Sequence, residues 1–369
     1  MKRRKETRTK TPRTIHTPYE TLLYRVDDAI ATITLNRPDR LNTIVPPMPD
    51  EIEAAIHRAV ADATVRVIVM RGAGRAFCAG FDFGGGFHQW DDQLTTDGKW
   101  DPGKDFIGAA AGFGLGAVPK FMSMWRSPKP VIAQVHGWCV GGGSDMALCA
   151  DLVIASEDAR IGTPYSRMWG CYLSGMWIYR LGLTKAKEYA LTGKPLSGAK
   201  AAEIGLINAA VPFERLEDEV RRAARDLASI PLSQLAAMKL IVNQAYENMG
   251  LASIQTLGPI LDGLMRNTPD AHRFIELAER EGVSGGLRGQ PRGKSRSTGR
   301  SKNTSDPPRC AGRMRRFTSG ILDADDVCAV GLLLAGRLAV VAEGAVPRGD
   351  RSRRVPKFAS VLVCASRRR

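Results

Sequence analysis

Short apolar runs alternate with amphipathic stretches through the first half of the chain. Apolar runs bounded by turn residues predict buried strands, and they occupy residues 21–26, 29–35, 65–70, 130–135, 151–155 and 160–162. The first two meet at Asp27-Asp28, which predicts a hairpin. Residues 48–61 place Ile52, Ala55 and Ala59 on one face of a predicted helix. Strands that alternate with helices indicate an α/β fold of repeated ββα units around a mostly parallel sheet.

Helical periodicity replaces this pattern from residue 174 onward. The predicted helices cover residues 174–181, 185–192, 197–203, 213–228, 231–248, 251–265 and 269–281. Residues 84–120 are rich in Gly, Asp and aromatic side chains. They are long for a loop and are predicted to form a functional lid.

Composition divides the chain into four predicted parts. They are a disordered basic N-terminus (1–18), a core domain (19–205), a helical C-terminal region (206–283) and a basic low-complexity tail (284–369). The tail has two interpretations. It is either a genuine basic segment that contacts anionic partners, or an out-of-frame reading of a GC-rich gene that has replaced the original C-terminus. The Arg, Gly, Ala and Pro bias favours the second.

The net charge of +15 suggests a nucleic-acid partner until its distribution is considered. Residues 1–13 carry seven Lys or Arg and one Glu, and residues 284–369 carry 19 Lys or Arg and six Asp or Glu. The remaining 270 residues are therefore slightly acidic, with 27 basic and 31 acidic side chains. Because the core is acidic and no recognition motif is present, we expect no nucleic-acid partner.

Three consecutive glycines, Gly141 to Gly143, separate a predicted strand from a helix predicted at residues 144–149. Glycine lets the backbone approach a ligand closely, and the free N–H groups at a helix N-terminus favour negative charge. Asp145 falls in the first turn of that helix. The pattern indicates an oxyanion-binding backbone beside a carboxylate, although a tight turn without a ligand would give the same triplet.

A second small-residue stretch follows the strand predicted at 65–70. Its sequence, Gly-Ala-Gly-Arg-Ala-Phe-Cys-Ala-Gly-Phe-Asp at residues 72–82, precedes His-Gly-Trp-Cys-Val-Gly-Gly-Gly-Ser-Asp-Met-Ala at residues 136–147. The two motifs together resemble the crotonase superfamily of enoyl-CoA hydratases and isomerases. The resemblance runs from about residue 19 to 282 and includes Leu35-Asn36-Arg37-Pro38 and Leu191-Thr192-Gly193. It implies the crotonase (ClpP-like) spiral fold, with C-terminal helices that form homotrimers, often paired as hexamers.

The resemblance also implies a site for an acyl-CoA thioester. Coenzyme A is then part of the substrate, and no further cofactor and no metal is expected. The backbone amides of Phe81 and Gly142 stand where the family holds the thioester oxygen as it becomes an enolate. The residues expected to contact the substrate are Arg40, Leu41, Cys78, Ala79, Gly80, Phe81, Asp82, Phe83, His88, Gly141 and Gly142.

Two side chains are candidates for proton transfer. Asp145 stands at the first catalytic glutamate of the hydratases and suits a general base, unless it only stabilises its helix. Tyr165 stands at the second glutamate, and a phenol with a pKa near ~10 donates a proton but is a poor base. Tyr165 is therefore either the acid or a bystander. In the second case His88 of the lid is the next candidate.

We expect an enoyl-CoA hydratase that converts a 2-enoyl-CoA to a 3-hydroxyacyl-CoA in fatty-acid metabolism. The tyrosine at position 165 keeps alternatives open: an enoyl- or dienoyl-CoA isomerase, a hydrolase, a dehalogenase or a non-catalytic acyl-CoA-binding homologue. The sequence does not specify the acyl chain.

Seven cysteines without a C-x-x-C pair do not suggest a disulfide framework or a zinc site. Cys78, Cys139 and Cys149 have small or apolar surroundings, which fit free thiols in a reducing compartment. The N-terminus lacks the apolar region of a secretory signal, and no run reaches the ~20 apolar residues of a membrane span. We therefore expect a cytoplasmic protein with no membrane partner.

Overall fold

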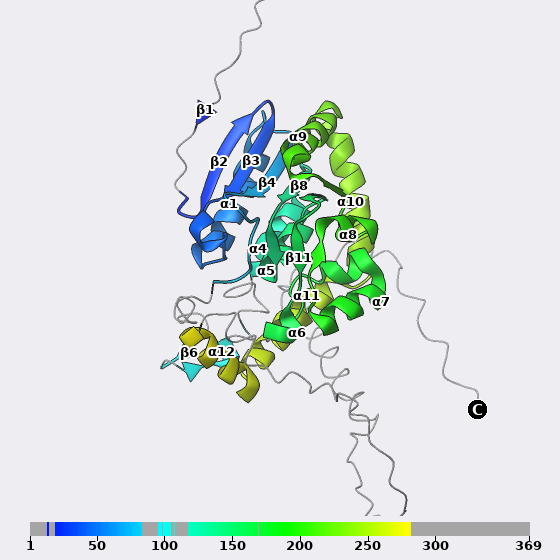
Figure 1. The fold of residues 1–369 in the computed structure, drawn as a ribbon. Coiled ribbons are helices and arrows are strands. Elements are labelled where there is room, and N and C mark those ends of the chain that lie inside the picture. The colour runs from blue at the N-terminus through cyan, green and yellow to red at the C-terminus, as the bar shows by residue number, and fades with distance from the viewer. Residues whose placement is uncertain are drawn as a thin grey trace, which may run out of the picture. The chain divides into compact units, whose positions relative to one another are not determined.

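The computed structural model describes residues 13–14, 19–82, 95–97, 99–104, 107, 117–168 and 170–281 (Figure 1). The chain divides into the units Met1–Lys294 and Ser295–Arg369, and all described residues lie in the first unit. The tail predicted from residue 284 and most of the predicted lid lie outside the described residues. Within the predicted N-terminal segment 1–18, only residues 13–14 are described.

Seven strands of the described chain form the main sheet. In spatial order they are β1 (Arg13–Thr14), β2 (Leu22–Asp27), β3 (Ile30–Leu35), β4 (Val67–Gly72), β8 (Val131–Val135), β10 (Leu152–Ser156) and β13 (Ala209–Val211). The first three are antiparallel, and every pair from β3 onward is parallel. The predicted hairpin is β2–β3, and its turn at Asp28 and Ala29 has positive φ at both residues. That geometry matches a tight primed turn, whose twist suits paired strands.

A smaller sheet contains β12 (Leu196–Ser197), β11 (Arg160–Gly162) and β9 (Trp138–Val140), in that order. Strands β9 and β11 are parallel, and they directly follow β8 and β10 of the main sheet. The pairs β8–β9 and β10–β11 therefore each give their first strand to the main sheet and their second to the smaller sheet, in agreement with the predicted ββα units, whereas β2 and β3 both lie in the main sheet. Apart from these sheets, β6 (Thr95–Thr96) pairs with β7 (Lys99–Trp100).

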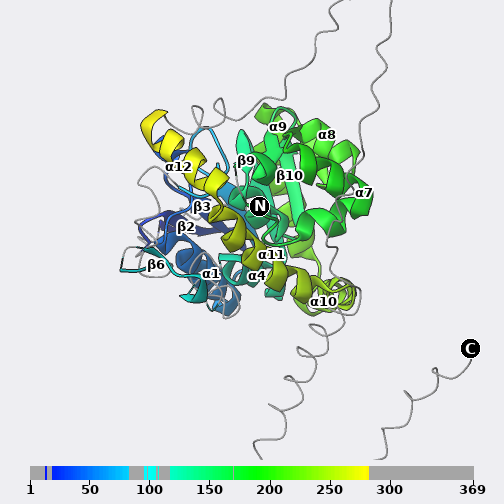
Figure 2. The same ribbon diagram turned by 90° about the horizontal axis from the view of Figure 1, so that it is seen from below.

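The helices lie close to where the periodicity predicts them. They are α1 (Pro47–Ala61), α4 (Ala117–Arg126), α5 (Gly142–Leu148), α6 (Tyr165–Met168), α7 (Met176–Thr192), α8 (Gly198–Glu203), α9 (Phe213–Ser229), α10 (Leu232–Asn248), α11 (Leu251–Arg266) and α12 (Pro269–Glu281), with the short 3-10 helix η1 at Pro38–Arg40. Gly182 interrupts α7 with non-helical angles, as the two separately predicted helices require. Helices α4 and α6 and the short helix η1 were not predicted. Figure 2 shows α10, α11 and α12 following one another past the sheet.

Both faces of the main sheet are covered. Along β4, Val67 and Val69 pack in a cluster with residues of α9, whereas Ile68 and Met70 pack in the larger cluster with residues of α1 and α4. Successive side chains of a strand point to opposite faces. A strand buried on both faces therefore reads as a continuous apolar run, as β4 does.

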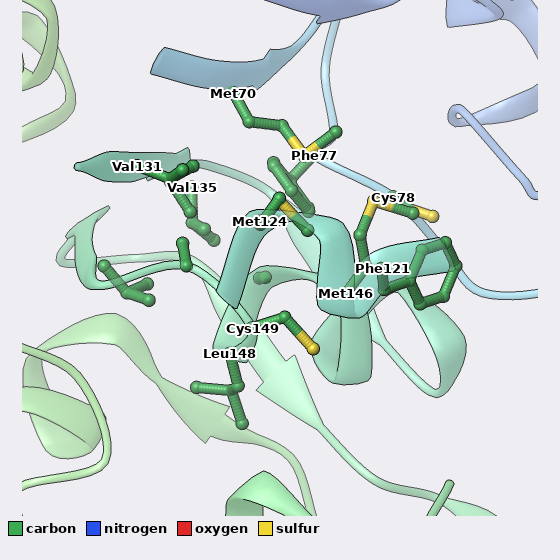
Figure 3. Packing of buried hydrophobic residues seen from close by; sticks show 14 of the residues in the cluster. Met70, Phe77, Cys78, Phe121, Met124, Val131, Val135, Met146, Leu148 and Cys149 are labelled. Atoms are coloured by element: carbon green, nitrogen blue, oxygen red, sulfur yellow. The ribbon is translucent and has the colours of Figure 1, made fainter. Parts of the chain in front are cut away.

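Helix α5 lies inside the larger cluster, and this burial fixes its position. Figure 3 shows Met146 of α5 among Phe77, Cys78, Phe121 and Met124. All five side chains are inaccessible to solvent. The residue before Met146 is Asp145, so the packing of α5 also places that carboxylate. In the described residues, no helix is both long and apolar enough to cross a membrane.

Candidate active site

The segment at residues 77–82 joins the two sequence motifs. On one side it pairs with His136 and with β9: the amide of Phe77 donates to the carbonyl of His136 (2.8 Å), and that of Cys78 to the carbonyl of Trp138 (2.9 Å). The amide of Val140 donates to the carbonyl of Cys78 at 3.1 Å. The two motifs, some sixty residues apart in sequence, therefore form neighbouring backbone segments.

On its other side the same segment pairs with the chain after η1. The amide of Ala79 donates to the carbonyl of Leu41 (3.0 Å), and the amide of Ile44 to the carbonyl of Gly80 (2.8 Å). Asp82 then donates its amide to the carbonyl of Ile44 at 2.9 Å. In this parallel pairing the amide between Gly80 and Asp82, that of Phe81, points away from Ile44.

The three glycines make the turn from β9 into α5 possible. Gly141 has φ +54° and ψ −129°, a backbone conformation that side chains rarely permit. A Cβ on Gly142 would lie 2.6 Å from the Phe81 ring, and one on Gly143 would lie 2.3 Å from the carbonyl oxygen of Cys78. Close approach of the two segments therefore requires glycine at both later positions.

These contacts bring the backbone beside Phe81 close to the amide of Gly142. A Cβ on Gly80, the residue before Phe81, would lie 3.9 Å from the amide nitrogen of Gly142. Gly142 is the first residue of α5, and among the described residues none accepts a hydrogen bond from its amide. The helix terminus thus leaves at least this N–H available to an anion.

Asp145 and Tyr165, the two candidates for proton transfer, are in direct contact. The Tyr165 hydroxyl donates to Asp145 Oδ2 at 2.5 Å. That hydroxyl also lies 4.0 Å from the position of a Cβ on Gly141, so the pair adjoins the turn from β9 into α5. Asp145 is fully buried, and Tyr165 is partly buried at the start of α6.

Ser174 completes the surroundings of the Asp145 carboxylate. Its amide (2.9 Å) and its hydroxyl (2.7 Å) both donate to Asp145 Oδ1. Burial raises the pKa of Asp145, while the bonds from Tyr165 and Ser174 oppose that rise. Burial, with the negative charge of Asp145, raises the pKa of Tyr165 well above 10. At neutral pH the phenol is therefore a neutral donor.

A second carboxylate near the pair comes from α11. Asp262 is 8 % exposed, and its Oδ1 accepts from the amide of Cys171 at 3.0 Å. Its charge contributes to the raised pKa values of both Asp145 and Tyr165. Neither Ser174 nor Asp262 was predicted as a site residue, because no local motif marks them and only the fold brings them to Asp145.

The loop expected to bind coenzyme A follows η1. Leu41 and Asn42 have positive φ, and the buried Asn42 side chain holds the loop by donating to the carbonyls of Ala73 (2.9 Å) and Ala76 (2.8 Å). Arg40 is the last residue of η1, and its side chain is 56 % exposed. The loop is therefore fixed in shape while Arg40 reaches solvent.

Asp82 is the last residue of the segment 77–82, called the oxyanion segment below because it contains Phe81. Its charge connects the segment to the loop after η1. Its carboxylate accepts from Arg37 (3.0 Å), Arg40 (3.3 Å) and the Thr43 hydroxyl (3.0 Å). Asp82 is buried, and the Arg37 side chain is 22 % exposed. The pair therefore links the predicted coenzyme A loop to the residue that follows Phe81.

The remaining predicted site residues differ in placement. The side chain of Cys78 faces the core, where burial raises the pKa of its thiol to about 12. Cys78 therefore presents only its backbone to the oxyanion segment. Phe83 and His88 lie outside the described residues.

Comparison with known proteins agrees with this architecture. The family model described as enoyl-CoA hydratase/isomerase matches residues 25–258. The chain is 33 % identical over 239 residues to a probable enoyl-CoA hydratase of Rhodobacter capsulatus and, over the same length, 33 % identical to the 1,2-epoxyphenylacetyl-CoA isomerase of Escherichia coli. Each match covers 62 % of this chain and 84 % of the relative.

The fold has solved counterparts as well. The structure of an enoyl-CoA hydratase from Mycobacterium smegmatis superimposes with a TM-score of 0.67 at 38 % identity, and the match covers 73 % of this chain and 92 % of that one. An enoyl-CoA hydratase/isomerase from Xanthobacter autotrophicus gives a TM-score of 0.62 at 32 % identity, covering 73 % and 97 %. The predicted crotonase fold is confirmed, and the chain belongs to the enoyl-CoA hydratase/isomerase family.

Proposed function

We propose that the protein binds acyl-CoA thioesters and stabilises the enolate form of the thioester with the amides of Phe81 and Gly142. The proximity of their two backbone segments supports this role, as does the Gly142 amide at the start of α5, which donates to none of the described residues. Donors fixed in place before the reaction lower the free energy of developing charge. Removal of one such donor typically costs roughly 2.7–4 kcal/mol of transition-state stabilisation.

The observation that carries the chemistry is the 2.5 Å hydrogen bond from Tyr165 to Asp145. Asp145 Oδ1 already accepts two bonds from Ser174, and Oδ2 accepts one from Tyr165. We infer that Asp145 exchanges protons with the substrate through the Tyr165 hydroxyl. As the phenol oxygen takes a proton, it passes its own to Oδ2. Tyr165 thereby stays neutral, as its raised pKa requires.

Hydration of a 2-enoyl-CoA follows from this relay. Water attacks C3 of the enoyl group as the relay removes one proton, which leaves Asp145 protonated and the thioester as its enolate. The relay then returns the proton to C2, giving a 3-hydroxyacyl-CoA and restoring the Asp145 carboxylate. This reaction belongs to fatty-acid metabolism.

Double-bond isomerisation is the second candidate, and the single relay favours it. An isomerase needs one group that removes a proton at one carbon and returns it at another, and it needs no positioned water. Tyr165 occupies the place of the second hydratase glutamate, so among the described residues Asp145 is the carboxylate that accepts a hydrogen bond from Tyr165 and would serve both steps. Hydration and isomerisation share the proposed enolate and the proposed relay.

Substrate binding is proposed to involve the loop that carries Arg40 and Leu41, together with residues 78–82. The exposed Arg40 guanidinium suits the phosphate groups of coenzyme A. The wild-type protein should turn over crotonyl-CoA or a 3-enoyl-CoA in an assay that separates hydrated from isomerised products by mass. If no member of a panel of enoyl-, dienoyl- and aryl-CoA thioesters is converted, the catalytic proposal fails.

We also propose that the protein is a homotrimer or a dimer of trimers. Large apolar side chains of α10 and α11 are exposed in the single chain: Met238, Leu240, Ile241, Val242, Leu257, Leu261, Leu264 and Met265. A large number of exposed apolar side chains on two consecutive helices is typical of an interface. Ile241→Asp should lower the molar mass measured by light scattering, whereas the exposed α9 variant Glu217→Lys should not.

A reducing compartment fits the buried thiols. Cys78, Cys139 and Cys149 are free and buried, and burial raises the pKa of each. We propose a cytoplasmic location on this basis.

A further inference from the structure

Helix α11 packs along residues 171–174, which contact the proposed relay of Asp145 and Tyr165. Gln255 donates its side-chain amide to the carbonyl of Ser174 at 3.1 Å, and Asp262 accepts from the amide of Cys171 at 3.0 Å. Between them, Gly258 approaches so closely that a Cβ there would lie 2.0 Å from the carbonyl oxygen of Tyr172. Positions 255, 258 and 262 lie on one face of a helix. This face of α11 therefore contacts residues 171–174 as a unit.

Residues 171–174 in turn contact both members of the relay, Asp145 and Tyr165. Ser174 donates two hydrogen bonds to Asp145, and the Tyr172 ring packs edge-on against the Tyr165 ring at a centroid distance of 6.5 Å. A Cβ on Gly170 would lie 2.6 Å from the Tyr165 ring and 2.8 Å from Asp262 Oδ1. Glycine at 170 thus lets the Asp262 carboxylate lie beside the Tyr165 ring with no side chain between them.

Asp262 also differs in charge from the other titratable groups around Asp145. In the described part of the chain these groups are Tyr165, Cys171 and Tyr172, with Cys139 of β9, Cys149 of α5 and Asp262 of α11. Burial raises the pKa of every thiol and phenol in this set, so all of them are neutral at neutral pH. The Asp262 carboxylate contributes to the raised pKa of Asp145.

We propose that Asp262 is a positioning residue of the acid–base site, and that α11 is thereby part of the active site rather than only an assembly element. Asp262 fixes the backbone at Cys171, and its negative charge makes Asp145 a stronger proton acceptor. The second role rests on the proposed function, whereas the first does not.

Two substitutions separate the charge from the hydrogen bond. Asp262→Asn keeps an acceptor for the Cys171 amide but removes the charge, so the pKa of Asp145 should fall. Because a base works in its ionised form, the acidic limb of the kcat/KM profile on crotonyl-CoA should move to lower pH. Asp262→Ala removes both features. It should lower kcat by roughly ten- to a hundredfold with little change in KM, since a misplacement of about 1 Å can cost about a hundredfold.

The rate of amide hydrogen exchange is a measurement that does not depend on turnover. In Asp262→Ala the amides of residues 170–175 should exchange about three- to tenfold faster, as loss of one hydrogen bond predicts. Asp262→Asn should restore slow exchange. Thr256→Ala, on the exposed side of α11, is the matched control and should leave exchange and pH profile unchanged.

The outcomes are distinct. Wild-type exchange at residues 170–175 in Asp262→Ala, together with an unshifted pH profile in Asp262→Asn, would overturn the proposal. If the alanine variant does not fold, the pH profile of the asparagine variant decides. If the wild type converts no thioester, the proposed function fails, and the exchange comparison alone decides whether α11 positions the segment.

Discussion

The candidate site has two halves that are built in different ways. The half at Phe81 and Gly142 consists of backbone: paired segments and three glycines bring two loops together. The half at Asp145 and Tyr165 consists of side chains supplied by α5 and α6 and held by Ser174. The first should therefore tolerate changes of side chain but not an added Cβ. The second should not tolerate the loss of a single proton acceptor or donor.

The largest effect is expected in the side-chain half, from Asp145→Asn. The substitution keeps the size of the side chain but removes the proton acceptor, and loss of a general base typically lowers the rate by roughly 10²–10⁴-fold. Binding of the thioester should persist, because the amides of Phe81 and Gly142 are unchanged. Steady-state kinetics and calorimetric titration with a saturated acyl-CoA measure the two properties separately. Asp270→Asn, exposed on α12, is the control.

The second-largest loss of activity is expected in the backbone half, from Gly142→Ala. The new Cβ would meet the Phe81 ring at 2.6 Å and the Ile44 side chain at 2.9 Å, so the two segments must separate. Weakening one oxyanion donor is expected to lower kcat by roughly 10²–10³-fold. Phe81→Leu keeps both amides and should lower kcat by less than about tenfold. Equal losses in the two variants would contradict a site built from backbone.

The ionic link between the predicted coenzyme A loop and the segment 77–82 gives a smaller effect. Asp82→Asn weakens a largely buried, charge-assisted hydrogen bond to Arg37, and should lower the free energy of unfolding by about 1–3 kcal/mol. It should also raise KM, because the loop after η1 loses its attachment to the oxyanion segment. Asp27→Asn breaks a pair in which both side chains are about half exposed, and should change stability by less than about 1 kcal/mol. Urea denaturation of the two variants tests the contrast.

The smallest effect concerns pH and stability. Burial raises the pKa of Asp145 above its unfolded value, so the folded protein holds this proton more tightly. Stability from that proton is full at low pH and is lost as the pH rises through the folded-state pKa. The wild type should therefore lose stability relative to Asp145→Asn as the pH rises above about 4, the ordinary pKa of an aspartate, and through the raised folded-state pKa. Denaturation of both proteins across this range measures the difference, and a constant difference would mean that the pKa is not raised.

The two halves also differ in how far the sequence predicts them. The backbone half was predictable because its requirements are local: an apolar strand, then glycines, then a helix. The Asp145 position followed from the same motif. The contact between Asp145 and Tyr165, and the roles of Ser174 and Asp262, depend on packing between segments that are 20 to 117 residues apart in the chain. No local pattern encodes such distances.

Periodicity placed most helices within two residues of their observed ends, since buried faces repeat along them. It missed the four-residue α6. It also missed α4, which follows a stretch without periodicity and carries Pro119 near its start. Its burial against α1 and α5, which no sequence window contains, stabilises it. The sequence thus predicted elements with their own apolar pattern better than contacts between elements.

The central claim is that Asp145 acts through Tyr165, and a double-mutant cycle tests it most directly. The kcat/KM of wild type, Asp145→Asn, Tyr165→Phe and the double variant would be compared on whichever enoyl-CoA the wild type converts fastest. If the two residues form one relay, each single substitution removes it, and the double variant is no slower than the slower single variant. A Tyr165→Phe variant with the wild-type rate, or losses that multiply in the double variant, would contradict the relay.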